Sequence, residues 1–185
     1  AWEQVGRRLG PAKARALIAA GERAASRPIP ALPATLWLEF QRTGERNGFQ
    51  EPRTARRQML TDLTLAECLE GRGRFLDPLL DVLWAILEES AWVLPAHQGT
   101  LTDMERPVID LGAAGTGIAL AECDYLLGSS VDPLVGKRIR YEVNRRLLTP
   151  YLTRHDFWWL YNTAQRTVNN WTAVCNSGVM AAALY

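Results

Sequence analysis

The sequence predicts an all-α protein, and two observations lead to this prediction. Over residues 76–87, apolar side chains recur every three or four residues, which is the spacing of an amphipathic helix: Leu76, Leu79, Leu80, Leu83, Trp84 and Leu87. No stretch alternates β-branched and polar residues between hairpin turns, as a half-buried strand would. The 185 residues suffice for one hydrophobic core. We therefore expect residues 1–185 to form a single α-helical domain.

Two helices are marked by an aspartate followed by a proline, at Asp77 and at Asp132. Aspartate is a preferred N-cap, and proline is well tolerated in the first helical turn. Weaker helical patterns predict further helices over 2–25, 53–70, 109–127 and 170–184, with stops at Gly71, Gly128 and Pro150. A Pro-rich connection is expected over 27–33 and an irregular stretch over 43–52. The other predicted helices are joined by short loops, which indicates helical hairpins.

The charge balance and the length of the apolar runs exclude two classes of partner. Lysine and arginine total 21 against 20 aspartates and glutamates, which leaves a net charge of +1. A dedicated nucleic-acid binder carries a strongly basic surface, and this chain does not. No apolar run approaches the ~20 residues that span a bilayer, since charged residues interrupt the runs at 76–87 and 111–128. We therefore expect neither a nucleic-acid partner nor a membrane partner.

Neither a metal site nor a cofactor is expected. The three cysteines lie far apart without a CxxC pair, and the sequence has no HExxH motif. The segment GAAGTG at 112–117 follows no predicted strand and lies in a helical pattern, so we reject it as a nucleotide-binding loop. The cysteines are therefore interpreted as free, small hydrophobic residues: Cys68, Cys123 and Cys175.

Four blocks of sequence follow one another in a recognisable order and spacing. They are GRGRFLDPLLDVLWAILEESAWVLPAH at 71–97, PVIDLGAAGTGIALAE at 107–122, RIRYEVNRRLLTPYL at 138–152 and NNWTAVCNSGVMAAAL at 169–184. Together they resemble the N-terminal (α/α) toroid of the heparinase II/III-like polysaccharide lyase superfamily. The resemblance covers residues 35–185. It implies that the helical hairpins form part of an incomplete (α/α) toroid, its N-terminal portion.

The resemblance also implies a reaction, the cleavage of uronic-acid glycans by β-elimination. In lyases of this kind, an Asn at the start of the helix after a Trp-rich loop neutralises the sugar carboxylate, and the matching positions are Asn169 and Asn170. Asn170 is our first choice, although Asn is equally a preferred N-cap. Several relatives have His where this chain has Trp171, which can only stack or donate one N–H. The ligand implied is an anionic polysaccharide or oligosaccharide.

The resembling lyases take their acid and base from a Tyr and a further His beyond the matching segment. General acid and base groups contribute ~10²–10⁴-fold to the rate of such proton transfers. Tyr185 ends the sequence, and we do not assign the Tyr role to it. We therefore expect the chain by itself to lack lyase activity.

Aromatic residues and one histidine are the candidates for substrate binding. The chain holds seven tryptophans, which can form a sugar-stacking cleft or simply fill the core. Those near predicted loop ends are candidates for the cleft, whereas core packing is expected for Trp37 and Trp84. His97 closes the LPAH block and is either a cleft residue or a structural one. The candidates are Trp171, His97, Trp92, Trp159 and Tyr161.

A cluster of arginines lies in the predicted helix 53–70 and just after it. These residues could meet an anionic glycan, but we favour a solvated helix face that nearby acids balance. The arginines are Arg53, Arg56, Arg57, Arg72 and Arg74, and the acids are Asp62, Glu67 and Glu70.

Two other functions are alternatives to a lyase. An (α/α) toroid glycoside hydrolase needs two carboxylates facing each other across a cleft, and the candidates near loop ends are Glu88, Glu89 and Asp110. A non-catalytic, glycan-binding helical module would use the Trp and Arg residues without turnover.

Self-association is the first testable consequence. An incomplete ring of hairpins exposes apolar helix faces beyond the few hundred Å² that monomers usually tolerate. We expect these faces to pack on another copy of the chain. Light scattering after size-exclusion chromatography should then give a mass above that of one chain, and a strictly monomeric mass contradicts this expectation.

Overall fold

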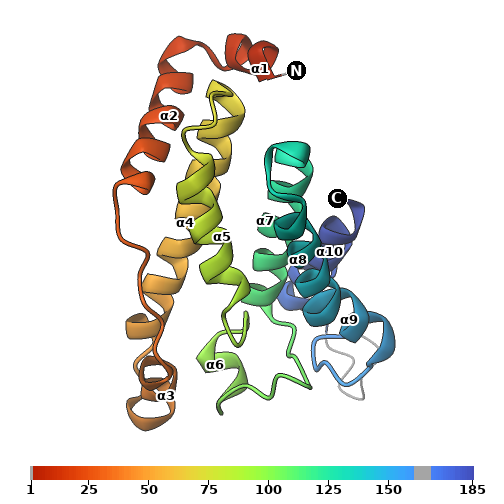
Figure 1. Ribbon diagram of the computed structural model, residues 1–185. Coiled ribbons are helices and arrows are strands. Elements are labelled where there is room, and N and C mark those ends of the chain that lie inside the picture. Colours follow the sequence, from red (N-terminus) through yellow and green to blue (C-terminus); the bar gives the residue numbers. More distant parts are fainter. Residues whose placement is uncertain (1, 161–167) are drawn as a thin grey trace.

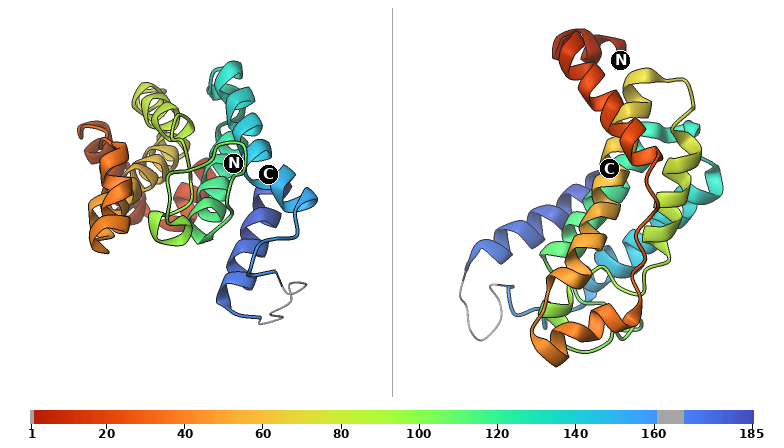
Figure 2. Two further views of the ribbon diagram at one scale, coloured as in Figure 1. Left: turned by 90° about the horizontal axis from the view of Figure 1, so that it is seen from below. Right: turned by 90° about the vertical axis from the view of Figure 1, so that its left-hand side faces the viewer.

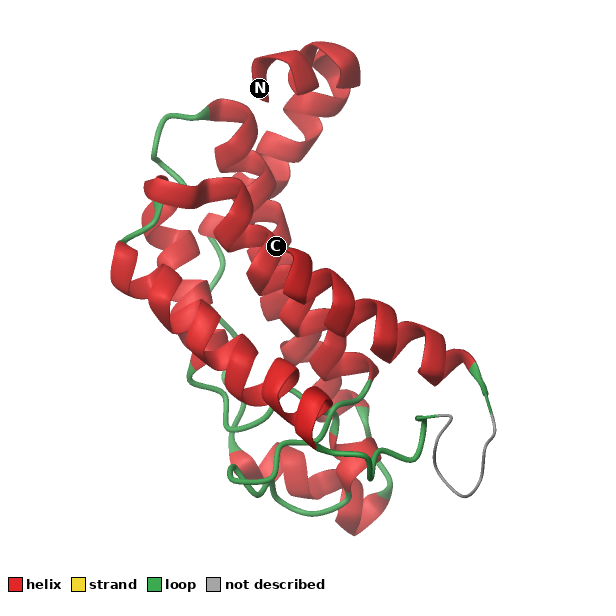
Figure 3. Cartoon of the chain, turned by 90° about the vertical axis from the view of Figure 1, so that its right-hand side faces the viewer, coloured by secondary structure: helices red, strands yellow, loops and turns green. Residues whose placement is uncertain are grey.

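A computed structural model describes residues 2–160 and 168–185, and within these ranges the chain is helix and loop without a strand (Figure 3). The all-α prediction is therefore confirmed. The helices are α1 (Trp2–Leu9), α2 (Pro11–Ala25), α3 (Ala34–Thr43), α4 (Asn47–Glu70), α5 (Leu76–Leu87), α6 (Pro95–Gln98), α7 (Leu111–Leu127), α8 (Pro133–Val143), α9 (Thr149–Thr153) and α10 (Asn170–Leu184).

The long helices pair as antiparallel neighbours, α4 with α5 and α7 with α8 (Figure 1). Helix α2 lies along α4, and α10 packs against α7 on the other side of the molecule (Figure 2). The contact of α4 with α7 joins the two hairpins around one large apolar core. Among the described helices, none combines the length and the apolar character needed to cross a bilayer.

Three of the predicted helix boundaries hold and two do not. Asp132 caps α8, because its carboxylate accepts the backbone N–H of Leu134 at 2.8 Å. Gly71 and Gly128 end α4 and α7 with positive φ, which glycine adopts without strain. Asp77 is no N-cap, since α5 begins one residue before it. The predicted stop at Pro150 is also wrong.

A π-helical turn explains why the chain remains helical at Pro150. Residues 144–148 form this turn between α8 and α9. Pro150 then occupies the first turn of α9, where its missing N–H is tolerated. The helix therefore ends only at Thr153.

The N-terminal third departs most from the sequence prediction. The helix expected over 2–25 is two helices, which Gly10 separates with φ 81°. Part of the stretch expected to be irregular, 43–52, belongs to α4, and the preceding α3 was not predicted. A second small core accounts for this, because the rings of Trp37 and Phe49 pack edge to face at 5.1 Å. The Trp37 indole also donates to the carbonyl of Thr100 at 2.9 Å.

The three cysteines are free and buried, as predicted. Burial raises the pKa of Cys68 and of Cys123 to about 11, and that of Cys175 to about 12. Each thiol is therefore protonated at neutral pH and acts as a small apolar group.

Two glycines test how closely α7 and α10 pack. A Cβ at Gly178 would lie 2.8 Å from the Cβ of Ala114, whereas a Cβ at Gly115 would meet nothing within 4 Å. Gly178→Ala should lower the free energy of unfolding by about 1–3 kcal/mol, because the helices must move apart. Gly115→Ala should raise it by about 0.5–1 kcal/mol, because alanine favours the helix. Urea unfolding followed by circular dichroism measures both, and equal effects would contradict the close packing.

Candidate functional site

Candidate residues from three separate segments meet at the N-terminal end of α10. The rings of His97 and Trp171 pack edge to face with centroids 4.5 Å apart. The Trp171 ring also packs against the ring of Trp158, with centroids 4.8 Å apart, and Trp158 is 48% exposed. Asn169 and Asn170 directly precede Trp171 at the start of this helix. The structure thus brings together four of the candidate site residues, and Trp158, another tryptophan near a predicted loop end, lies beside them.

Asp110 fixes the orientation of His97. Its carboxylate is fully buried at the N-terminus of α7, where it accepts the backbone N–H of Ala113 at 2.6 Å and that of Leu94 at 3.0 Å. The same carboxylate lies 2.6 Å from Nδ1 of His97. Since a carboxylate accepts, we assign the Nδ1 proton to this bond, which leaves Nε2 for another partner. The His97 side chain is 19% exposed.

The short helix α6 explains how His97 reaches Asp110. Pro95 starts this helix, and the carbonyl of Leu94 accepts the N–H of His97 at 2.9 Å. The bond from the Leu94 N–H to Asp110 ties this turn to the N-terminus of α7. Two of the four sequence blocks, at 71–97 and 107–122, therefore meet through one carboxylate.

The two asparagines have different roles. Asn169 is the N-cap of α10, and its side chain accepts the backbone N–H of Trp171 at 2.9 Å. Thr172 completes a capping box with it. Asn170 is the first residue of the helix, and its side chain is exposed. Capping therefore accounts for Asn169 and leaves the amide of Asn170 available to a ligand.

Trp92 and Trp159 lie in the core. The indole of Trp92 donates to the carbonyl of Ile86 at 3.2 Å, and that of Trp159 donates to the carbonyl of Ile109 at 2.9 Å. Both side chains are fully buried, so in this structure they pack in the core below the site and are not exposed to a substrate. Tyr161 lies outside the described residues.

Core packing was expected for Trp37 and Trp84, and it is confirmed for Trp37 only. Trp37 is buried, as expected, because it forms the second small core with Phe49. Trp84 is 42% exposed, so the prediction of core packing is wrong for it. Its ring lies on the outer side of α5, beside Arg138 of α8.

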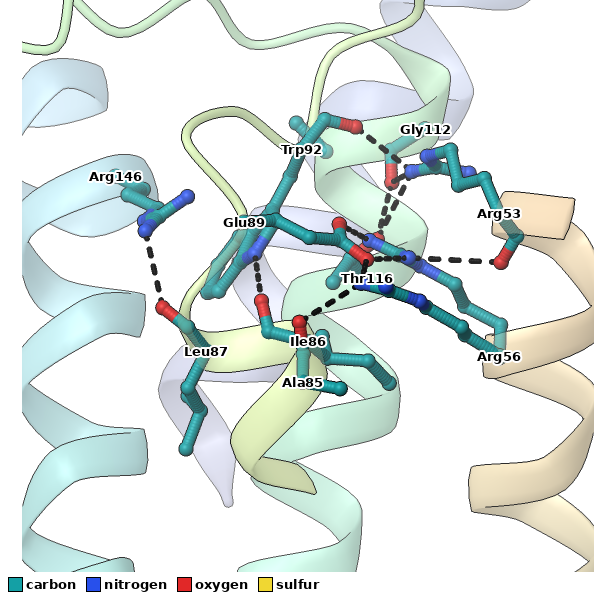
Figure 4. Close-up of polar contacts among 12 residues, drawn as sticks. Arg53, Arg56, Ala85, Ile86, Leu87, Glu89, Trp92, Gly112, Thr116 and Arg146 are labelled. Carbon is teal, nitrogen blue, oxygen red and sulfur yellow. Dashed lines mark hydrogen bonds and ion pairs between the residues drawn. The ribbon is translucent and has the colours of Figure 1, made fainter. Parts of the chain in front are cut away.

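The first three arginines are not a solvated helix face, which corrects that interpretation (Figure 4). Arg56 and Arg57 of α4 both pair with Glu89, at 3.1 and 2.5 Å, and all three side chains are largely buried. Arg53 is buried beside them and donates to the hydroxyl of Thr116 at 3.0 Å. We call Arg53, Arg56, Arg57, Glu89 and Thr116 the Glu89 cluster.

The Glu89 cluster also holds the backbone beneath the site. One nitrogen of Arg53 donates to the carbonyl of Trp92 at 2.7 Å and to that of Gly112 at 2.8 Å. These carbonyls lie two residues from Leu94 and from Asp110, the bonded pair that positions His97. Burial and the neighbouring Arg57 lower the pKa of Arg53 to about 10, so it is still a cation at neutral pH. Arg53 is therefore a positioning residue.

Arg72 and Arg74 lie apart from the Glu89 cluster, after the end of α4. Arg74 pairs there with Glu70 and with Glu22 of α2. Both side chains of the Arg74–Glu22 pair are about half exposed, so for Arg74 the expected solvated face, balanced by a neighbouring acid, is confirmed. Arg72 is exposed as well.

Two of the three carboxylates that a glycoside hydrolase could use are engaged within the protein, those of Glu89 and Asp110. Glu89 is held by two arginines, and Asp110 is fully buried against His97. Glu88 is exposed and caps the C-terminus of α5. In the described ranges, no group of three His, Cys, Asp or Glu side chains could hold a metal ion.

Two sequence comparisons with known proteins give no match. A scan of the sequence against models of protein families finds none that fits, and a search of curated proteins finds no similar chain.

Glu89→Gln tests the Glu89 cluster. The change leaves two largely buried guanidinium groups without a carboxylate, so it should lower the free energy of unfolding by about 3–5 kcal/mol. Urea unfolding followed by circular dichroism measures this loss. Glu22→Gln, which removes the exposed pair with Arg74, is the control and should leave the midpoint nearly unchanged. Equal midpoints for the two variants would show that the cluster does not hold the fold.

Proposed function

We propose that this chain supplies the carboxylate-binding end of the active site of a polysaccharide lyase that acts on uronic-acid glycans by β-elimination. One observation supports the proposal most directly. The exposed amide of Asn170 lies at the N-terminus of α10, beside Trp171 and its partner His97. A polar donor, an oriented imidazole and exposed aromatic rings are thus adjacent at one end of a helix.

Neutralising the sugar carboxylate is the step that these residues fit. β-Elimination removes the weakly acidic C5 proton, and negative charge then develops on the carboxylate as an enolate. The Asn170 amide can donate a hydrogen bond to that group. The positive end of the dipole of α10 favours the same charge. Donors that are already oriented toward developing charge usually make the largest single contribution to the rate.

The neighbouring rings fit the sugar itself. Trp171 is partly exposed and Trp158 is half exposed, so both can stack on the apolar face of a pyranose. The Nε2 atom of His97 can accept a hydroxyl of the sugar, or donate to its carboxylate when the ring is protonated. Asp110 keeps the imidazole in one orientation for either role.

The proposed lyase site is incomplete in this chain. The resemblance assigns the general acid and base to a Tyr and a His beyond the matching segment. It also implies the incomplete (α/α) toroid, which is part of the same proposal. The antiparallel pairs α4–α5 and α7–α8 are consistent with such a ring of hairpins. We therefore expect this chain to bind the glycan without cleaving it.

Binding without cleavage is also what a non-catalytic glycan-binding module would do. The same observation favours it as a second candidate, because the described site offers stacking rings and donors. The two candidates differ in whether cleavage follows binding once the acid and base that the resemblance implies are supplied. A lyase forms an unsaturated uronate, whose ultraviolet absorbance rises during the reaction, whereas a binding module forms none.

Asn170→Ala tests the proposed role in this chain. Calorimetric titration with heparin, alginate and hyaluronan oligosaccharides should show binding to one of them that weakens about tenfold, the effect of one lost hydrogen bond to a charge. Asn47→Ala is the matched control, since Asn47 is also the exposed first residue of a long helix. Absence of binding to all three glycans, or an equal loss in the control, argues against the proposal.

A further inference from the structure

A second surface, away from the N-terminus of α10, lies between α5 and the start of α8. Two adjoining hollows of about 210 and 670 Å³ share Leu80 and Asp132 in their walls. Apolar side chains line the larger one, including Trp84 and Leu134, which is 72% exposed. Helices α5 and α8 contact each other and lie on the same side of the molecule in the left view of Figure 2. We call this surface the α5–α8 groove.

The sequence of α5 explains why its outer side is both apolar and acidic. Its inner side is fully buried, with Leu79, Val82, Leu83, Ile86 and Leu87 in the core. Asp77, Asp81 and Glu88 are exposed, and their spacing of four and seven residues puts them on one outward stripe of the helix. Trp84 lies on the same stripe and is also exposed. An exposed Trp among carboxylates is not required by the packing of the core.

Among the described residues, none forms an ion pair with the three acids of α5 at the rim of the groove. In the described part of the molecule, no ion pair involves Asp77, Asp81 or Glu88, while Asp132 only caps α8. One cation, Arg138, lies beside Trp84, with its guanidinium 5.8 Å from the centre of the ring. That guanidinium is already paired with Glu142 at 2.9 Å. The rim therefore carries three carboxylates without an ion pair among the described residues, around an apolar floor.

We propose that the α5–α8 groove docks a basic amphipathic helix of a partner protein. Apolar side chains at helical spacing would cover Leu80, Trp84 and Leu134, while lysines and arginines on the flanks would meet the rim acids. Charge complementarity selects this occupant, because an acidic rim repels anionic glycans, anionic lipids and nucleic acids. The large half-buried Trp84 is the anchor, as aromatic residues are at many interfaces. This inference is independent of the proposed lyase site.

The probe is a dye-labelled helical peptide with leucines at i, i+3, i+4 and i+7 and lysines elsewhere, titrated by fluorescence anisotropy. The intact chain should bind it, and binding should weaken steeply with salt. Trp84→Ala and the triple variant D77K/D81K/E88K should each weaken binding at least tenfold. A peptide of the same pattern with glutamates in place of lysines should not bind. Circular dichroism checks that each variant is folded.

The control variant E3K/E51K/E105K makes the same change in net charge at exposed acids outside the groove. It should bind the lysine peptide within twofold of the unchanged chain. Equal weakening in this control would overturn the proposal, because it would show attraction by net charge alone. Undiminished binding by Trp84→Ala would also overturn it. A chain that dimerises, and becomes monomeric in D77K/D81K/E88K, would instead identify a second copy as the occupant.

Discussion

The guanidinium of Arg53 joins the loop after α5 to the start of α7, and the backbone of the candidate site depends on this junction. It is buried between two carbonyls, those of Trp92 and Gly112, which belong to the loop after α5 and to the first turn of α7. A buried cation is stable only where acceptors surround it, so the loop and the helix start have to be placed together. Glu89, which pairs with the adjacent Arg56 and Arg57, and Asp110 both favour the charged form of Arg53. The backbone that carries His97 and Asp110 is thereby fixed from below.

Much of the fold follows from local sequence signals, and helices α3 and α9 are exceptions for two different reasons. Helix α5 was predicted from its apolar stripe, and the ends of α4 and α7 from glycines that adopt positive φ. Helix α3 has no such signal, because it is held by the distant contacts of Trp37 with Phe49 and Thr100. Helix α9 depends on a π-helical turn, which shifts Pro150 into a position where it is tolerated. The local sequence pattern therefore does not predict α3, because contacts with distant residues hold that helix.

The site was predictable in its residue types and less so in its pairings. Asn169, Asn170, Trp171 and His97 were singled out from sequence, and they meet at the start of α10. The bond of His97 to Asp110 was missed, although an aspartate just before an apolar helical pattern is a recognisable N-cap signal. The arginines were matched with nearby acids, because the partner Glu89 lies more than thirty residues away. Ion pairs between distant segments leave no periodic trace in a sequence.

The three buried thiols can report how readily individual helices separate from the core. Cys68 lies on α4, Cys123 on α7 and Cys175 on α10, and each is buried in the shared core. A buried, protonated thiol reacts with an alkylating reagent only when its helix separates from the others. The rates of alkylation at the three positions therefore rank the helices by how readily each detaches. The rate at Cys175 reports directly on the helix that carries Asn170 and Trp171.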